Sequence, residues 1–459
     1  MPKVERVIFT KEMKKDYTVL IPNMLPIHMD LIRDVMCKAG FKAEVMKNNG
    51  PSVVTEGLAH THNDICYPAL LVIGQMLDEL QSGRHDPDRT AFMITQTGGG
   101  CRASNYIALM RKALARAGYP QVPVISLSAT GMEKNPGFEL TLPQWLRVLW
   151  AVALGDFLML IYNQCRPYEV HEGSADRALS SLKAEISAGL CGDKLISREQ
   201  VHSYYNKILE TFDALPKAGQ GTKPRVGVVG EIYVKYSPMG NNNLEKFLIS
   251  EGAEVVTPGL VDFLLYCAHN YTEDRRLYGM SAVMALLGGG AQRVLEKIQD
   301  VQIKTVESYN REKGTAFTTA THFARVRELS ARYISPGVKM GEGWLLTGEM
   351  AELIDSGVNS IVCTQPFGCL PNHIVGKGMM RALKLRNPQA NIVAVDYDPG
   401  ASAVNQQNRI KLMLARAHAA METAGDGGAR TARRAAEAGE EKENSRKMTL
   451  RAADARARG

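Results

Sequence analysis

The chain has 459 residues, 45% of them hydrophobic and 22% charged, which is enough apolar material for two or three folded domains. Its opening residues are charged and interrupted, so we expect no secretory signal, a cytoplasmic location and eight mostly reduced cysteines. The net charge of +7 comes partly from an Arg-rich tail after His418. No basic stripe interleaved with aromatic residues runs through the body of the chain, so we expect no nucleic-acid partner.

In the first part of the chain, short β-rich runs alternate with segments of helical periodicity. This pattern is typical of parallel α/β units. The strands predicted there are residues 17–22, 42–46, 91–97 and 122–128. The helices predicted there, with Leu, Ile and Met at helical spacing, are residues 27–39, 68–80 and 104–117.

Two helical segments follow before the next strands. Residues 144–162 are the most apolar segment of the chain, but Arg147 and Asp156 interrupt it. Because a membrane span needs about 20 nearly uncharged residues, we expect a core helix and no membrane partner. Residues 171–222 are polar, helical in pattern and end in the linker-like PKAGQGTKP.

The last part of the chain repeats the α/β arrangement. The predicted strands are residues 225–233, 253–259, 359–366 and 390–398. The predicted helices are residues 242–250, 373–385 and 404–414, together with a long helical insertion at about 275–335.

The predicted fold class is therefore α/β, with two flavodoxin- or Rossmann-like parallel-sheet lobes and a helical connection. We expect the first lobe at 1–170, the connection at 171–222 and the second lobe at 223–416. The tail 417–459 mixes Ala, Arg, Glu and Gly without a sustained apolar face. We predict that it is a disordered or frayed extension.

Three cysteines lie where ligands bind in α/β folds, in loops that lead from strands into helices. Cys101 follows a strand and three glycines, Cys369 follows a strand and a Pro-Phe-Gly turn, and Cys66 directly precedes Tyr-Pro at a helix start. Proline favours the first helical turn, where backbone N–H groups stabilise a thiolate or an anionic cluster. The neighbouring glycines permit close approach of a bulky inorganic group. These cysteines are the candidate ligands.

A free cysteine in a reduced protein is most often a small buried hydrophobe, so each thiol alone is weak evidence for a site. Cys363 lies inside a predicted strand, where we favour core packing over ligation but keep it as a further candidate ligand. The remaining cysteines, Cys37, Cys165, Cys191 and Cys267, lie in helical or connecting patterns and are interpreted as structural.

Two kinds of metal centre remain open. Structural zinc sites usually contain close CxxC pairs, which are absent here, although the His60–His62 segment near Cys66 leaves a mixed Cys/His site open. Three dispersed thiols suit a [4Fe–4S] cluster with one open iron better. The glycine-rich TGGGC and LLGGGAQ segments lack the residues of a phosphate-binding loop.

Six motifs carry a resemblance to a known family: NDICYPALLVIGQ, TQTGGGCRASNY, RPYE, GEIYVKYSPMGNNNLEKFLISEGAEVVTPGL, QPFGCLPNHIVGKG and DYDPGASAVNQQNRIKLM. Together they resemble the 2-hydroxyacyl-CoA dehydratase-like proteins. More narrowly, they are similar to the branch labelled CoA-substrate-specific enzyme activase, or acyl-CoA dehydratase activase-related protein. The resemblance spans about residues 15–415 and leaves out the tail.

The resemblance implies two flavodoxin-like lobes with an iron–sulfur cluster in the cleft between them, held here by Cys66, Cys101 and Cys369. It implies a [4Fe–4S] cluster, with a double-cubane cluster as the variant found in some relatives. The implied electron donor is a separate actin-like ATPase activator that carries its own cluster. In true dehydratases, the acceptor is a 2-hydroxyacyl-CoA thioester, which becomes a ketyl radical and loses water.

Some features depart from the family pattern or leave its details open. The chain lacks the nucleotide fingerprint of the actin-like ATPase, so we do not expect it to hydrolyse ATP itself. Nothing specifies a CoA pocket, and the partner subunit could be a related dehydratase-like chain or a second copy. An exposed low-potential cluster would favour anaerobic life. The alternative is a non-catalytic scaffold, or a zinc-stabilised subunit, of a larger complex.

Overall fold

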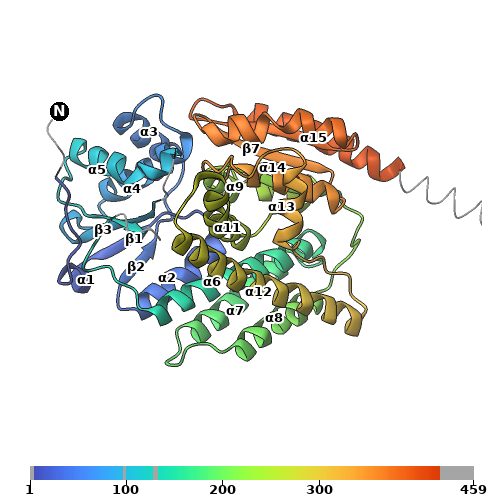
Figure 1. Ribbon diagram of the computed structural model, residues 1–459, viewed down its shortest axis with the longest axis horizontal. Helices are drawn as coiled ribbons and strands as arrows, with labels where there is room; N and C mark the ends of the chain where they lie inside the picture. Colours follow the sequence, from blue (N-terminus) through green and yellow to red (C-terminus); the bar gives the residue numbers. More distant parts are fainter. Residues whose placement is uncertain (1–4, 97–99, 128–132, 424–459) are drawn as a thin grey trace, which may run out of the picture.

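The computed structural model describes residues 5–96, 100–127 and 133–423 (Figure 1). Within these residues, the chain forms two lobes, each built on a four-stranded sheet in which every pairing is parallel. The predicted α/β class with two parallel-sheet lobes is therefore confirmed. Most of the predicted tail, residues 424–459, lies outside the described residues, as do residues 97–99 of the TGGGC segment.

The first sheet has the strand order β2-β1-β3-β4. Its strands are β1 (Thr18–Ile21), β2 (Lys42–Val45), β3 (Thr90–Thr95) and β4 (Val124–Leu127). The helices of this lobe are α1 (Met13–Asp16), α2 (Pro26–Lys38), α3 (Pro51–His60), α4 (Tyr67–Gln81) and α5 (Tyr106–Arg116). All four predicted strands and three predicted helices form here, and α1 and α3 are additional helices.

Helix α4 is the central helix of the first lobe, with nearly all of its residues buried. It crosses α3 closely, because a Cβ added at Gly74 would come within 2.0 Å of the carbonyl oxygen of Val53. Only a residue without a side chain allows this backbone approach. The crossing fixes α4, and therefore the loop that precedes it, against the sheet.

Three long helices lie between the two sheets in the chain: α6 (Leu142–Cys165), in the range expected for the first lobe, and α7 (Ser174–Leu190) and α8 (Arg198–Asp213), in the range expected for the connection. Capping boxes begin α6 at Thr141 and α8 at Ser197. Helix α6 is long and apolar enough to cross a membrane by length and composition alone, but 67% of its most apolar window is buried inside the protein. It packs with α7 and α8 around Phe157, Ile186 and Phe212, as predicted for a core helix.

The second sheet has the equivalent order, β6-β5-β7-β8. Its strands are β5 (Arg225–Gly230), β6 (Glu254–Val256), β7 (Ser360–Pro366) and β8 (Asn391–Tyr397). The helices beside it are α9 (Ile232–Tyr236), α10 (Leu244–Ser250), α15 (Met380–Arg386) and a helix over residues 403–423. All four strands predicted for this part of the chain are present.

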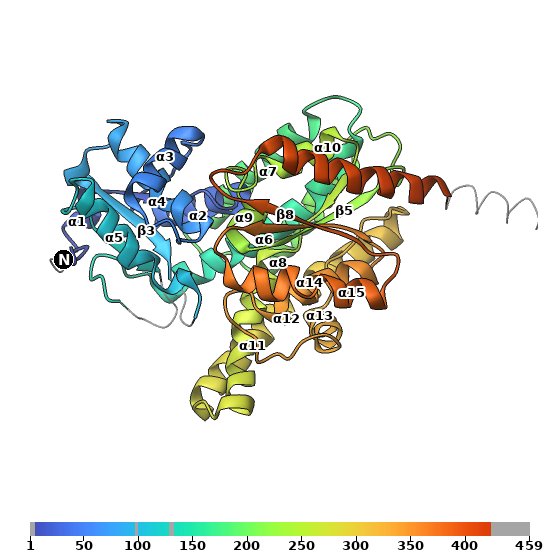
Figure 2. The ribbon, with the colours of Figure 1, turned by 90° about the horizontal axis from the view of Figure 1, so that it is seen from above.

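Four helices lie between β6 and β7, where a helical insertion was expected at about 275–335. They are α11 (Leu260–Tyr278), α12 (Ala282–Lys313), α13 (Phe323–Ala331) and α14 (Trp344–Asp355). The end of α11 and the start of α12 form an arm that projects from the body of the protein (Figure 2). The helical region is thus longer than the predicted insertion at both ends.

A buried carboxylate on α6 connects the two lobes. Asp156 Oδ1 lies 2.8 Å from Nε2 of His28 on α2 of the first lobe. The backbone N–H groups of Leu260 and Val261, at the start of α11, also donate to Asp156, at 2.8 and 2.7 Å. Acidic side chains are stabilising at a helix N-terminus, so Asp156 holds α2, α6 and α11 together.

Candidate functional site

Cys66 is the N-cap residue of α4 and is buried. Its Sγ atom lies 3.1 Å from the hydroxyl oxygen of Tyr106 on α5. The peptide N–H of Tyr67, the next residue, donates to the carbonyl of Phe367 at 3.0 Å. The N-terminus of α4 in the first lobe is therefore hydrogen-bonded directly to the Phe367 turn of the second lobe.

Cys101 begins a single 3₁₀ turn, Arg102–Ser104, after strand β3. Its carbonyl accepts from the hydroxyl of Ser104 at 2.7 Å, and Gln96, at the end of β3, donates to the carbonyl of Ser104 at 2.9 Å. These bonds fix the loop, although Cys101 itself is only half-buried. The described part of this loop begins at Gly100, so the glycines before it are outside the described residues.

Cys369 follows strand β7 in a tight turn. Gly368 has φ +69°, and the N–H of Cys369 donates to the carbonyl of Pro366 at 3.3 Å, which is the pattern of a glycine-containing β-turn. The Nδ2 group of Asn372 donates to Cys369 Sγ at 3.4 Å. Asn372 begins a π-helical turn, Asn372–Lys377, and such turns are frequent at functional sites.

The three cysteine loops come together at glycines. A Cβ added at Gly368 would lie 3.1 Å from the Cα of Cys66, so this glycine lets the Cys369 turn pack on the Cys66 loop. A Cβ added at Gly341, which has φ +57°, would lie 3.6 Å from Cys101 Sγ and 3.0 Å from Pro371 Cγ. The structure thus brings the loops of Cys66, Cys101 and Cys369 together at the junction of the lobes.

Burial raises the pKa of all three thiols. The pKa of Cys101 rises to about 11, and the pKa values of Cys66 and Cys369 are raised as well. Two buried carboxyl groups, Glu231 and Glu342, act in the same direction, since negative charge nearby disfavours a thiolate. In the metal-free protein, these cysteines are neutral thiols, and ligation by a metal would have to displace their protons.

The carboxyl pair is a part of the site that sequence reasoning missed. Glu231 follows β5 and accepts from the N–H of Val234 at 2.9 Å, and Glu342 accepts from the N–H of Ile232 at 2.9 Å. Burial first, and then repulsion by Glu342, raises the pKa of Glu231 to about 8. A carboxyl group with such a pKa can hold a proton near neutral pH and release it.

A buried ion pair lies on the same elements. Lys235 Nζ on α9 is 2.9 Å from Glu349 Oε1 on α14, and both side chains are almost fully buried. The pair therefore fixes α9, which Glu231 begins, against α14, which Glu342 precedes. Glu231 entered the sequence analysis only as part of a family motif, and Glu342 and Glu349 gave no signal there.

Cys363 lies inside β7, in a fully buried cluster with Met350 and Leu383, and a Cβ added at Gly376 of the π-helical turn would lie 3.4 Å from its Sγ atom. Burial raises its pKa to about 12. The histidines near Cys66 have other partners: His60 Nδ1 lies 3.1 Å from the carbonyl of Glu56, and His62 Nε2 lies 3.0 Å from Lys112 Nζ.

The arrangement of the donor groups bears on which metal centre they could hold. Within residues 5–96, 100–127 and 133–423, no three His, Cys, Asp or Glu side chains are gathered closely enough to hold a metal ion. A tetrahedral zinc ion, with Zn–S bonds of about 2.3 Å, needs such a compact set. Thiolates that bind different irons of one cluster are farther apart. The described residues therefore do not form the compact donor set of a single metal ion.

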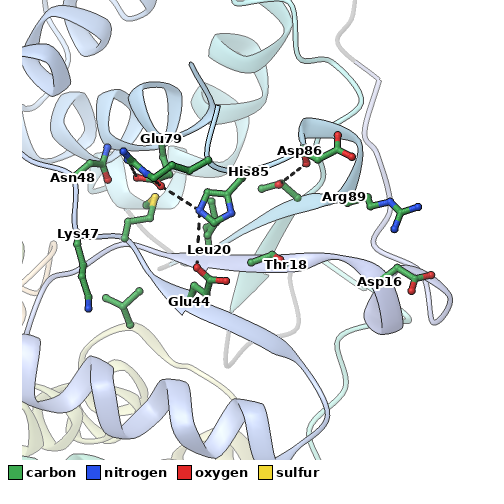
Figure 3. A pocket seen from close by; sticks show the side chains of 14 residues that line it. Asp16, Thr18, Leu20, Glu44, Lys47, Asn48, Glu79, His85, Asp86 and Arg89 are labelled. Carbon is green, nitrogen blue, oxygen red and sulfur yellow. Dashed lines mark hydrogen bonds and ion pairs between the residues drawn. The ribbon is translucent and has the colours of Figure 1, made fainter. Parts of the chain in front are cut away.

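A hollow lies elsewhere, beside β1 and β2 in the first lobe (Figure 3). It has a volume of about 890 Å³, and none of the three candidate cysteines lines it. In Figure 3, His85 points between Glu79 and Glu44, with nitrogen–oxygen distances of 3.2 and 4.0 Å. Glu79 also pairs with Arg84 at 2.7 Å. These charged groups of the hollow therefore pair with one another, and the three thiols remain the candidate site.

A scan against protein-family models gave no match, and a search of curated proteins found no significantly similar sequence.

Proposed function

We propose that this protein is an iron–sulfur protein of the 2-hydroxyacyl-CoA dehydratase type, with a [4Fe–4S] cluster held by Cys66, Cys101 and Cys369. The observation that carries the proposal is the meeting of three cysteine loops, from two lobes, at glycines that permit their close approach. The strand orders β2-β1-β3-β4 and β6-β5-β7-β8 also correspond to the first four strands of the flavodoxin-like order.

In this proposal, the chain's residues hold and tune the site. A bound cluster would supply one-electron transfer and an iron with an open position for a substrate oxygen. The hydroxyl of Tyr106 is placed to donate to the sulfur of Cys66, and Asn372 donates to the sulfur of Cys369. Hydrogen bonds to ligand sulfurs are among the features that set a cluster's potential.

Glu231 is proposed as the proton store of the site. Its pKa of about 8 keeps the buried carboxyl protonated at neutral pH, so it adds no negative charge beside an anionic cluster. Loss of water from a 2-hydroxyacyl thioester requires a proton for the leaving oxygen. A neutral buried carboxyl near the thiols is suited to supply that proton.

The surroundings of the thiols support a partner and a small substrate. Four apolar side chains near the cysteine loops, Met340, Phe367, Leu370 and Ile374, are each at least half exposed. Exposed apolar groups around a site are typical of surfaces that bind partners or ligands. We propose that an ATP-hydrolysing activator delivers the electron here and that the acceptor is an acyl-CoA or another small molecule.

Iron and acid-labile sulfide content, with an absorption spectrum, tests the cluster on protein purified without oxygen. We expect about four irons per chain, or about eight for a double-cubane cluster. Cys66→Ser, Cys101→Ser and Cys369→Ser should each lower the iron content and bleach the spectrum. Cys191→Ser, in the connection, is the matched control and should keep both. Unchanged iron content in all three variants would show the assignment to be wrong.

A non-catalytic scaffold subunit is the second candidate. The observation that favours it is the raised pKa of every thiol at the site, since neutral buried thiols are also what simple core packing produces. Protein that stays colourless after anaerobic reconstitution with iron and sulfide would favour the scaffold. Bound zinc at about one ion per chain, lost in Cys66→Ser, would favour the zinc-stabilised form.

A further inference from the structure

A further hollow, of about 340 Å³, lies between α11, α13 and the start of α14, and we call it the α13 pocket. The buried ring of Trp344 stands edge-on to the ring of His269, which also lines the pocket, with 6.1 Å between the ring centres. Pockets that bind small molecules have volumes of about 300–1,000 Å³, so this one suits a small organic molecule rather than a nucleotide. Its apolar lining consists of Ala324, Ala331, Ile334, Pro336 and Trp344.

One cation in this pocket lacks a partner. Arg327, on α13, lines the pocket and is partly buried. Among the residues that the structure describes, no carboxylate or other acceptor lies within ion-pair or hydrogen-bonding distance of its guanidinium. A partly buried charge is costly unless an opposite charge or a hydrogen-bond acceptor pairs with it. Arg327 is therefore available to an anion from solution.

The carboxylate beside Arg327 on α13 does not supply that partner. Glu328 pairs with Arg325 at 2.8 Å and with Arg332 at 2.6 Å. Arg325 also pairs with Asp355 at 2.8 Å, so these two arginines balance two carboxylates. The charge of Glu328 is thus neutralised within the chain and does not cancel the charge of Arg327.

The α11 side of the pocket adds no further net charge. Glu273 pairs with Arg276 at 2.6 Å, and Nε2 of His269 lies 3.5 Å from Oε1 of Glu273. Burial first, and then the charge of Arg327, lowers the pKa of His269, so its imidazole is neutral at neutral pH. The lining residues and their ion-pair partners therefore leave one uncompensated charge, and that charge is positive.

We propose that the α13 pocket binds a small monocarboxylate that carries an apolar group. The carboxylate pairs with Arg327, because a planar guanidinium can donate two parallel hydrogen bonds to it, and the apolar group contacts Trp344 and Ile334. A phosphate group, with about two charges at neutral pH, exceeds the single positive charge of the pocket. The inference does not depend on the cluster, because the pocket residues belong neither to the cysteine loops nor to the carboxyl pair Glu231 and Glu342.

Ligand-observed NMR titrations on the full chain test the proposal, with benzoate as the probe. We expect saturable binding of benzoate, and at least about tenfold weaker binding of benzamide, which has the same shape without the charge. Acetate keeps the charge but lacks the ring, so it should also bind at least about tenfold more weakly. A wild type that binds no benzoate at about 10 mM would overturn the proposal, as would equal affinities for benzoate and benzamide. Displacement of benzoate by equimolar inorganic phosphate would overturn the assignment to carboxylates.

Three variants test the location of the site. Arg327→Gln removes the charge and should raise the benzoate Kd at least about tenfold. Arg311→Gln, at an exposed position of α12 outside the pocket, is the matched control and should leave the Kd unchanged. Ala331→Phe, at an exposed position of α13, fills the pocket and should abolish binding. Circular dichroism checks that each variant is folded. Unchanged benzoate binding in either Arg327→Gln or Ala331→Phe would overturn the proposal.

Discussion

The two lobes share one strand plan but place different chemistry at corresponding positions. Cys101 follows β3, the third strand of the first lobe, and Cys369 follows β7, the third strand of the second. Cys66 immediately precedes α4, whereas Glu342 stands just before α14, the helix that leads into β7. The first lobe thus supplies two thiols, and the second supplies one thiol and buried carboxyls. The shared topology of the two lobes therefore determines the positions of the candidate site residues, but not their residue types.

The two lobes also differ in how their most buried helices are held in place. Helices α4 and α14 each precede the third strand of their sheet, and both are almost fully buried. Helix α4 packs against α3 at Gly74, where the absence of a side chain lets the two backbones approach closely. Helix α14 is instead joined to α9 by the ion pair of Glu349 with Lys235. The first lobe should therefore be sensitive to added volume, and the second to a lost charge.

The largest expected effect is in the second lobe. Lys235→Met leaves Glu349 buried without its partner, so we expect the free energy of unfolding to fall by about 3–5 kcal/mol. Adding Glu349→Leu removes the orphaned charge and should recover most of that loss. Urea unfolding of the single and double variants measures both. Equal destabilisation by the single and the double variant would show that packing, rather than charge, holds α14.

A smaller effect is expected in the first lobe. Gly74→Ala should lower the free energy of unfolding by about 1–3 kcal/mol, because the new methyl group overlaps the Val53 carbonyl and forces α3 and α4 apart. Gly289→Ala is the control, as its nearest atom would be 3.9 Å away. There we expect a gain of up to about 1 kcal/mol from helix propensity. If Gly74→Ala leaves the free energy of unfolding unchanged, the proposed steric difference between the lobes is wrong.

A third effect concerns pH and the carboxyl pair. The pKa of Glu231 is raised to about 8, so the folded metal-free protein binds more protons than the unfolded chain between the usual carboxyl pKa and that value. Stability should therefore fall as pH rises through this window, by about 2 kcal/mol between pH 6 and 8. Glu231→Gln should flatten that slope, and Glu185→Gln on the exposed face of α7 should not. Urea unfolding at both pH values measures this difference.

The strands were predictable because each falls in a short β-rich run between segments of helical periodicity. All eight predicted runs overlap observed strands, with small differences at the ends, such as β3 beginning at Thr90, one residue before its predicted run. Helix α3 was not predicted, because its ten residues, PSVVTEGLAH, carry only a short apolar pattern. Its position depends on the contact with Gly74 of α4, which local sequence does not reveal.

The candidate site was predictable only in part. Each cysteine is recognisable beside a glycine or proline at a strand or helix end, but their meeting depends on packing between lobes. Gly341, whose added Cβ would reach Cys101, lies 240 positions along the chain from that cysteine. Glu342 could not be predicted either, because the N–H group that donates to it belongs to Ile232, 110 residues earlier in the chain. Interactions at such distances leave no local pattern.

The joint at Asp156 limits how the protein can move. Bonds from His28, Leu260 and Val261 converge on this one carboxylate from both lobes. Hydrogen bonds to a charged group contribute about 1.5–3 kcal/mol each, so swinging the lobes apart about α6 would cost several kcal/mol. Access to the thiols should then depend on local opening of the loops rather than on a hinge between rigid halves. The body of the protein would act as a fixed frame, with motion confined to the loops that carry the thiols.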